Sequence, residues 1–188
     1  MTDSGASPGQ VVTSVNNAIS KKNSCVSIYA TRQATEQALE NLRKAGIDLQ
    51  RVSVIGRGCH AQTQPVGFYN IDGCIRYWGS EGAFWSGLLV LLSDAAFFCA
   101  SEFGPLMAVG SIVTSLVRGL EDVAIGGGFS VFGAALYNIG IPRDSIRQYE
   151  QLIRAEQFLL LVHSERSDVE RAFEILHNET QQVTVHSA

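Results

Sequence analysis

Positive charge is scarce in this sequence and is nowhere concentrated. Lysine and arginine together number 14 against 18 aspartate and glutamate residues, so the net charge is −4 at neutral pH. The tightest basic cluster is the pair Lys21-Lys22, which is too small to follow a phosphate backbone. These features exclude a nucleic-acid-binding surface of the usual basic kind.

A secretion signal is also lacking. The first residues, MTDSGASPGQ, are polar and provide neither the charged region nor the apolar region that such a signal requires. We therefore expect a cytoplasmic, reducing compartment in which the cysteines are free thiols. Two disulfides are the alternative, because the sequence contains four cysteines: Cys25, Cys59, Cys74 and Cys99.

Nucleotide-binding and catalytic motifs are missing as well. Gly56 and Gly58 follow an expected strand, but the third glycine and the following helix of a dinucleotide-binding turn are not there. The glycines of AIGGGFS lack the Lys-Ser/Thr of a P-loop. A Cys–His nucleophilic pair would need an orienting group and an oxyanion site, and no motif supports either. We therefore expect no enzyme activity and no cofactor.

The N-terminal part of the chain contains a strand–helix–strand pattern. Residues 25–30 and 51–55 are short runs rich in β-branched side chains, which is typical of strands. Between them, apolar residues recur at helical spacing over 32–45. Thr31 or Thr35 is suited to cap this helix.

The C-terminal part repeats this pattern. Residues 157–163, QFLLLVH, form a continuous apolar run, as expected of a strand buried on both faces. A helix over 168–177, capped by Ser167, and a strand over 182–186 follow. Two such units predict an α+β fold, a ferredoxin-like split βαβ sandwich of four strands and two helices.

A long insertion separates the two halves of this sandwich. The chain thus divides into a flexible N-terminal arm, the first half, the insertion, and a linking helix with the second half, at 1–22, 23–58, 59–142 and 143–188. Within the insertion we expect an aromatic loop over 59–80 and then helices over 81–100 and 106–140. The turn signal Gly104-Pro105 joins these helices into a Gly-rich hydrophobic hairpin.

Small residues recur every four positions in the second expected helix. This spacing lets helices approach closely, within one subunit or across an oligomer seam. The residues concerned are Ser111, Ser115, Gly119, Gly126, Ser130 and Ala134.

The hairpin either meets a membrane or is buried in an assembly. Residues 83–101 are just long enough to span a bilayer but contain Asp94, and the next apolar run ends too early at Arg118. Asp94 and Arg118 lie at comparable distances from the turn, so we expect them to form a buried charge pair. Phe84 and Trp85 belong either to an interfacial aromatic belt or to the packing against the sandwich.

Metal and ligand candidates are few. Cys59, His60 and Cys74 are the nearest approach to a metal cluster, but their spacing is poor for zinc, so we expect no metal site there. His163 and His186 each end an expected strand of the sandwich. These two strand ends could lie close together, which makes the histidines weak candidates for a shared ligand or a proton-sensing pair.

Two long segments carry a family resemblance. HAQTQPVGFYNIDGCIRYWGSEGAFWSGLLVLL and GIPRDSIRQYEQLIRAEQFLLLVH resemble the bacterial general-stress (heat-induced stress) protein family, whose domains carry a Gly-rich hydrophobic hairpin. The resemblance covers residues 25–187. It implies a role in stress response with no motif assigned to catalysis. Asp94, Cys99 and Glu102 stand where that family more often has glycine or apolar residues, which weakens the case for a membrane span.

These observations together predict a non-enzymatic stress-response protein. We expect it to self-assemble and to associate with the inner membrane through its hairpin, so that its partners are copies of itself and membrane lipid. The alternative is a soluble homo-oligomeric regulatory protein that binds a ligand or a metal and buries its hairpins between subunits.

Overall fold

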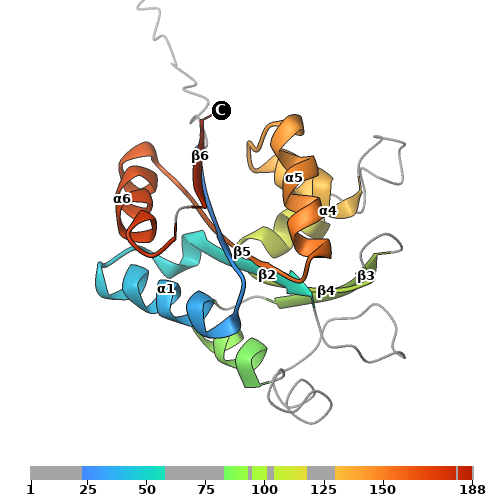
Figure 1. The fold of residues 1–188 in the computed structure, drawn as a ribbon, viewed down its shortest axis with the longest axis horizontal. Helices are drawn as coiled ribbons and strands as arrows, with labels where there is room; N and C mark the ends of the chain where they lie inside the picture. Colours follow the sequence, from blue (N-terminus) through green and yellow to red (C-terminus); the bar gives the residue numbers. More distant parts are fainter. Residues whose placement is uncertain are drawn as a thin grey trace, which may run out of the picture.

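A six-stranded antiparallel sheet, in the order β3-β4-β2-β5-β1-β6, forms the centre of the fold (Figure 1). The computed structural model describes residues 23–57, 83–92, 95–100, 104–117, 130–180 and 182–187. The strands are β1 (Asn23–Tyr29), β2 (Val52–Arg57), β3 (Ala95–Ala100), β4 (Gly104–Gly110), β5 (Phe158–Ser164) and β6 (Val183–Ser187). With helices packed on this sheet, the predicted α+β class is confirmed.

Helices cover both faces of the sheet. The labelled helices are α1 (Arg32–Lys44), the short 3₁₀ helix η1 (Leu49–Arg51), α4 (Val131–Asn138), α5 (Arg143–Arg154) and α6 (Arg166–His177). Two further helical segments span residues 83–92 and 112–117. Side chains of α1, α6 and the 83–92 helix pack on one face, whereas α4, α5 and the 112–117 helix pack on the other.

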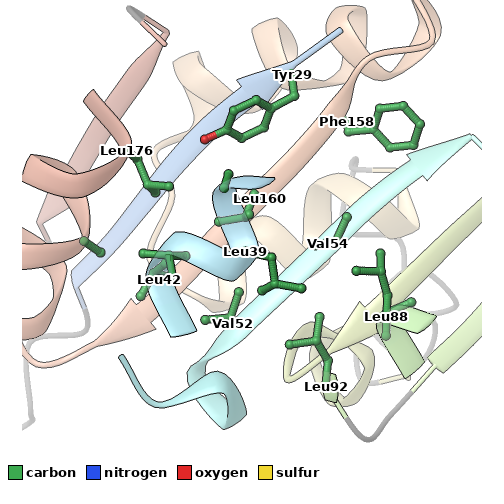
Figure 2. Close-up of a cluster of buried hydrophobic side chains, with 14 of the residues drawn as sticks. Tyr29, Leu39, Leu42, Val52, Val54, Leu88, Leu92, Phe158, Leu160 and Leu176 are labelled. Carbon is green, nitrogen blue, oxygen red and sulfur yellow. The ribbon is translucent and has the colours of Figure 1, made fainter. Parts of the chain in front are cut away.

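Strand β5 shows why its sequence is apolar from Phe158 to Val162. Leu160 and Val162 point into the core beneath α1 and α6, whereas Leu159 and Leu161 point into the core beneath α4 and α5. Figure 2 shows the first of these cores, in which Leu160 lies near Leu39 of α1. Successive side chains of a strand alternate between faces, so a strand covered on both sides needs apolar residues at every position. The predicted doubly buried strand is confirmed.

The first helix follows its sequence signals closely. Thr31 is the N-cap of α1, and its side-chain oxygen accepts a hydrogen bond of 3.2 Å from the backbone N–H of Ala34. Gly46 follows the helix with a φ of +76°, the left-handed conformation that glycine adopts without strain. Of the two predicted caps, Thr31 is the one used.

The start of the last helix differs from its prediction. Helix α6 begins at Arg166, with Glu165 at the N-cap position, so Ser167 lies inside the helix and does not cap it. Ser164 at the end of β5 instead donates a hydrogen bond of 2.8 Å to the carboxylate of Asp168. This contact ties the first turn of the helix to the strand, while the N-cap residue Glu165 makes no side-chain capping hydrogen bond.

The prediction of a helical hairpin is wrong for the middle of the insertion. Residues 83–92 are helical as expected, but β3 and β4 occupy the region where the two long helices were predicted to continue and meet. The two strands pair with each other, and β4 also pairs with β2, from Ser53↔Gly110 to Arg57↔Leu106. Residues 95–100 and 104–110 therefore form strands that extend the sheet, not the predicted helical hairpin.

The reason for this error lies in the apolar runs themselves. Residues that are apolar at every position fit a buried strand and a buried helix equally well, because such a run has no periodicity. Leu106 and Ala108 are buried beneath one helical layer, and Met107 and Val109 beneath the other. The strand is thus buried on both faces by segments distant in sequence, which no local pattern reveals.

A glycine ends β4. Gly110 has a φ of +102°, and a Cβ at this position would lie 2.2 Å from the carbonyl oxygen of Val52. Next to it, the Ser53 hydroxyl oxygen accepts a hydrogen bond of 3.0 Å from the N–H of Ile112. The close approach of β2 to the turn therefore requires glycine and places the 112–117 helix against the sheet.

Candidate functional site

Three polar side chains form a row across one end of the sheet. Ser24 of β1 lies opposite His163 of β5 on one side and opposite His186 of β6 on the other. Directly opposed residues point to the same face, so all three lie on the face covered by α4 and α5. The expectation that His163 and His186 come close together is thus met in register, with one serine between them.

The hydroxyl of Ser24 determines how His163 is held. Ser24 is fully buried, and its hydroxyl donates a hydrogen bond of 3.0 Å to the carbonyl oxygen of Ile139. The Ser24 oxygen lies 3.1 Å from Nδ1 of His163. Because the hydroxyl proton is already donated to Ile139, Nδ1 of His163 is the donor in this contact. When the His163 ring is neutral, its lone pair therefore lies on Nε2.

His186 has a different partner. Its Nε2 lies 2.7 Å from the hydroxyl oxygen of Tyr149 on α5, and the two rings meet edge to face with centroids 5.8 Å apart. Both side chains are buried. Burial raises the pKa of Tyr149 to about 12 and lowers the pKa of His186 below its usual value. Both groups are therefore neutral near pH 7.

The row has a clear structural role. Ser24 connects β1 to the end of α4, and Tyr149 connects α5 to β6, so each hydrogen bond joins the sheet to the helices above it. Within the part of the chain that the structure describes, no three His, Cys, Asp or Glu side chains lie close enough together to hold a metal ion. His163 contacts Ser24, and His186 contacts Tyr149.

Sequence reasoning missed the partners of the two histidines. Ser24 lies just before the predicted start of the first strand, although it continues the alternation with Val26 and Ile28. Tyr149 is buried on α5 beside Ile146 and Ile153, and its contact with His186 depends on how α5 docks on the sheet.

The small residues predicted to form a seam lie in separate elements. Ser111 is exposed in the turn after β4, and Ser115 lies in the 112–117 helix. Ser130 is the N-cap of α4, where its oxygen accepts a bond from Gly133 N and its hydroxyl donates to Glu150 Oε1 at 2.6 Å. Ala134 is buried in α4. These four residues therefore do not line one continuous helix.

Several predicted site residues lie outside the described part of the chain. They are the remaining two seam positions, the charge pair and the weak metal candidates: Gly119, Gly126, Asp94, Arg118, Cys59, His60 and Cys74.

The helix at 83–92 presents a second candidate site, on the molecular surface. Its inner face is anchored by aromatic packing, with the rings of Phe84 and Trp85 at 5.5 and 6.0 Å from that of Phe158. Gly56 makes room for this packing, since a Cβ there would lie 2.5 Å from Phe158 Cδ1. Phe84 and Trp85 are thus buried against the sheet, and neither belongs to an interfacial aromatic belt.

The opposite face of this helix is exposed and apolar. The exposed residues follow helical spacing, and we call them the outer face: Ala83, Gly87, Val90 and Leu91. Val90 is 68 % exposed and Leu91 is 44 % exposed. Among the aliphatic side chains of the described residues, these are the two largest exposed fractions. Among the described residues, no atom beyond the helix lies within 4 Å of the Cβ position of Gly87. An amphipathic surface helix would carry polar residues here.

Among the helices that the structure describes, none is both long enough and apolar enough to cross a bilayer.

Fold and candidate sites define an α+β protein with a buried polar row and an apolar outer helix face. Comparisons of the chain with models of known protein families, with curated proteins and with solved structures found no match.

Proposed function

We propose that this chain is a non-enzymatic stress-response protein that self-assembles through the outer face of the 83–92 helix. The observation that carries the proposal is the exposure of Val90 and Leu91, 68 % and 44 %, on a helix with no charged residue. Contiguous exposed apolar side chains favour burial against a partner. The stress-response part of the proposal is supported by the family resemblance alone.

The charges near the helix in the sequence favour a second copy over a lipid surface. Glu81 and Asp94 flank it in the sequence, and no lysine or arginine occurs between Arg76 and Arg118. Helices that lie on membranes usually carry basic residues, because the cytoplasmic leaflet is anionic. The open space at Gly87 would in turn let two such helices approach closely.

The fold proposed for the subunit is a ferredoxin-like sandwich enlarged by a hairpin. The order β2-β5-β1-β6 supports this assignment, because each half contributes one central and one outer strand to the four. Helices α1 and α6 pack in the same core on one face, as the two helices of such a sandwich do. On this view β3 and β4 extend the sheet beyond β2, and the 83–92 helix is added beside α1.

The assembly surface is tested by placing charge on it. The double variant Val90→Asp, Leu91→Asp buries charge in any contact made by the outer face, so we expect it to sediment as a smaller species than the wild type. Val117→Asp is the matched control, since Val117 is 39 % exposed and lies on a helix of the opposite sheet face. We expect it to sediment like the wild type.

Two results would contradict this assignment. One is a wild-type protein that is monomeric at every concentration, and the other is a double variant that assembles unchanged. Circular dichroism of both variants checks that the subunit fold is retained.

A second candidate function is peripheral contact with the inner membrane through the same face. It is favoured by the exposed apolar side chains of Val90 and Leu91, which an interfacial helix would insert among the acyl chains. Flotation of the wild type with lipid vesicles, lost in the Val90→Asp, Leu91→Asp variant, would support it. Sedimentation of the protein alone, without lipid or detergent, distinguishes the two functions. Self-assembly predicts an oligomer under these conditions, whereas membrane contact by itself does not.

A further inference from the structure

Strand β6 is an edge of the sheet. It pairs with β1 on one side, from Asn23↔Ser187 to Ser27↔Val183, and it is the last strand in the sheet order. Among the described residues no other strand pairs with it. Figure 1 places β6 at the top of the view and the 83–92 helix, in green, below α1 at the bottom.

The direction of the backbone groups of β6 follows from one hydrogen bond. The N–H of Ile28 donates to the carbonyl oxygen of Gln182 at 3.2 Å, so the backbone of Gln182 faces β1. In an antiparallel pair the facing residues alternate, so Thr184 and His186 also face β1. The N–H and C=O groups of Val183, Val185 and Ser187 therefore point away from the sheet.

This outward edge lacks the features by which proteins block strand addition. Natural edge strands are protected by charged side chains, proline or bulges. β6 has the sequence VTVHS, without charge or proline, and its register with β1 is continuous over all five residues. Most of its side chains are exposed or half-buried, including Val185 at 38 %. Within the described part of the chain, the edge is open to a further strand in both its backbone and its side chains.

The strand is also complementary to itself. If a second copy added its β6 in antiparallel direction about a two-fold axis at Val185, Val185 would face its own counterpart, and Val183 would face Ser187 of the copy. These are the residues whose backbone groups point outward, so the pairing satisfies them. No charge meets its own copy across the axis, and valine pairs with valine, a combination that suits strands.

We propose that β6 docks on β6 of a second copy of this chain, forming one continuous sheet across two subunits. The unpaired backbone groups require a strand as occupant, and the neutral, self-complementary sequence selects the same strand. This contact is separate from the outer helix face. Two different two-fold contacts on one subunit build assemblies larger than a dimer.

The test uses charge reversal at the axis. In the background of Val90→Asp, Leu91→Asp, which removes the contact of the helix face, the full-length chain should still form a dimer through β6. Val185→Lys and Val185→Glu, each added to this background, place like charges opposite each other, so each alone should sediment as a monomer. An equimolar mixture of the two should restore the dimer, because opposite charges then meet.

The outcomes distinguish this proposal from the proposed function. A parent variant that is monomeric throughout, or a Val185→Lys protein that dimerises unchanged, overturns β6 pairing and leaves the assembly through the helix face untouched. A mixture that stays monomeric also overturns it, because a merely damaged strand would not recover, whereas a specific two-fold contact would. Val117→Lys in the same background is the control for added charge and should leave the dimer intact.

Discussion

The helices of the terminal halves bury their apolar residues, whereas the helix of the central segment leaves some of its apolar residues exposed. In the terminal halves, α1 and α6 bury one face and carry ion pairs on the other, such as Arg43 with Glu40 and Arg166 with Glu170, both at 2.7 Å. In the central segment, the 83–92 helix is apolar on both faces. An amphipathic helix is complete once it packs on its sheet, whereas this helix still exposes apolar surface.

Because of this difference, the residues that stabilise the subunit fold are not the residues that are free to contact a partner. The buried faces of both regions contribute to the free energy of unfolding, whereas the outer face of the 83–92 helix is free to contribute to association. Substitutions can therefore be chosen that affect one property and leave the other unchanged.

The largest loss in the free energy of unfolding is expected from truncating a core side chain of a terminal half. Leu160 of β5 is fully buried, so Leu160→Ala should lower the free energy of unfolding by about 2–5 kcal/mol. Leu91→Ala is the matched change on the outer face, where the side chain is 44 % exposed, and should alter stability much less. Urea denaturation of both variants, in the monomer, measures the difference. Equal losses would show that Leu91 is buried in the subunit itself.

A smaller effect is expected from two glycines of the central segment. Gly110→Ala places a Cβ 2.2 Å from the Val52 carbonyl at a positive φ, which should destabilise the fold by about 1–3 kcal/mol or more. Gly87→Ala meets no neighbour and lies in a helix, so it should stabilise the subunit by about 0.5–1 kcal/mol. Thermal melting compares the two variants. A destabilised Gly87→Ala monomer would mean that the outer face is covered within the subunit.

The smallest effect concerns the polar row and depends on pH. Burial lowers the pKa of His186, so the folded protein binds this proton less readily than the unfolded chain does. Stability from this source is therefore present above the ordinary histidine pKa of about 6.5 and is lost as the pH falls from there through the folded value. Tyr149, whose pKa is raised to about 12, stays neutral over this range.

His186→Gln is the variant that isolates this effect. Its urea midpoint should fall less than that of the wild type between pH 7.5 and pH 5. Carboxylates protonate in both proteins and cancel in the comparison. The same pH dependence in both proteins would show that His186 titrates at its ordinary value in the folded state.

The sequence was sufficient for the terminal halves because their signals are local. Thr31 caps the helix that follows it by accepting from the N–H of Ala34, three residues away, and the alternation of Leu159 to Val162 between two cores is visible as an unbroken apolar run. The central strands were missed because their partners are distant. β4 is a strand because β2 pairs with it and helices cover both its faces. The sequence of residues 104–110 alone does not predict these contacts.

The sequence predicted the positions of the two histidines of the candidate site but not their hydrogen-bond partners. The positions of His163 and His186 at strand ends predicted their proximity, because strand order brings both beside β1. Their partners depend on the docking of α4 and α5 over the sheet, which no spacing encodes. The exposure of Val90 and Leu91 was equally hidden, since an all-apolar helix does not show which side faces the sheet.

The central claim is that residues 95–100 and 104–110 are strands of the sheet, while the outer face of the 83–92 helix remains free for a partner. Nuclear Overhauser contacts of the isotope-labelled protein in detergent-free buffer test it most directly. The account predicts cross-strand backbone contacts between Val54 and Val109 and between Ile55 and Ala108, as the register requires. Sequential helical contacts from residue i to i+3 throughout 95–110, without contacts to β2, would contradict it.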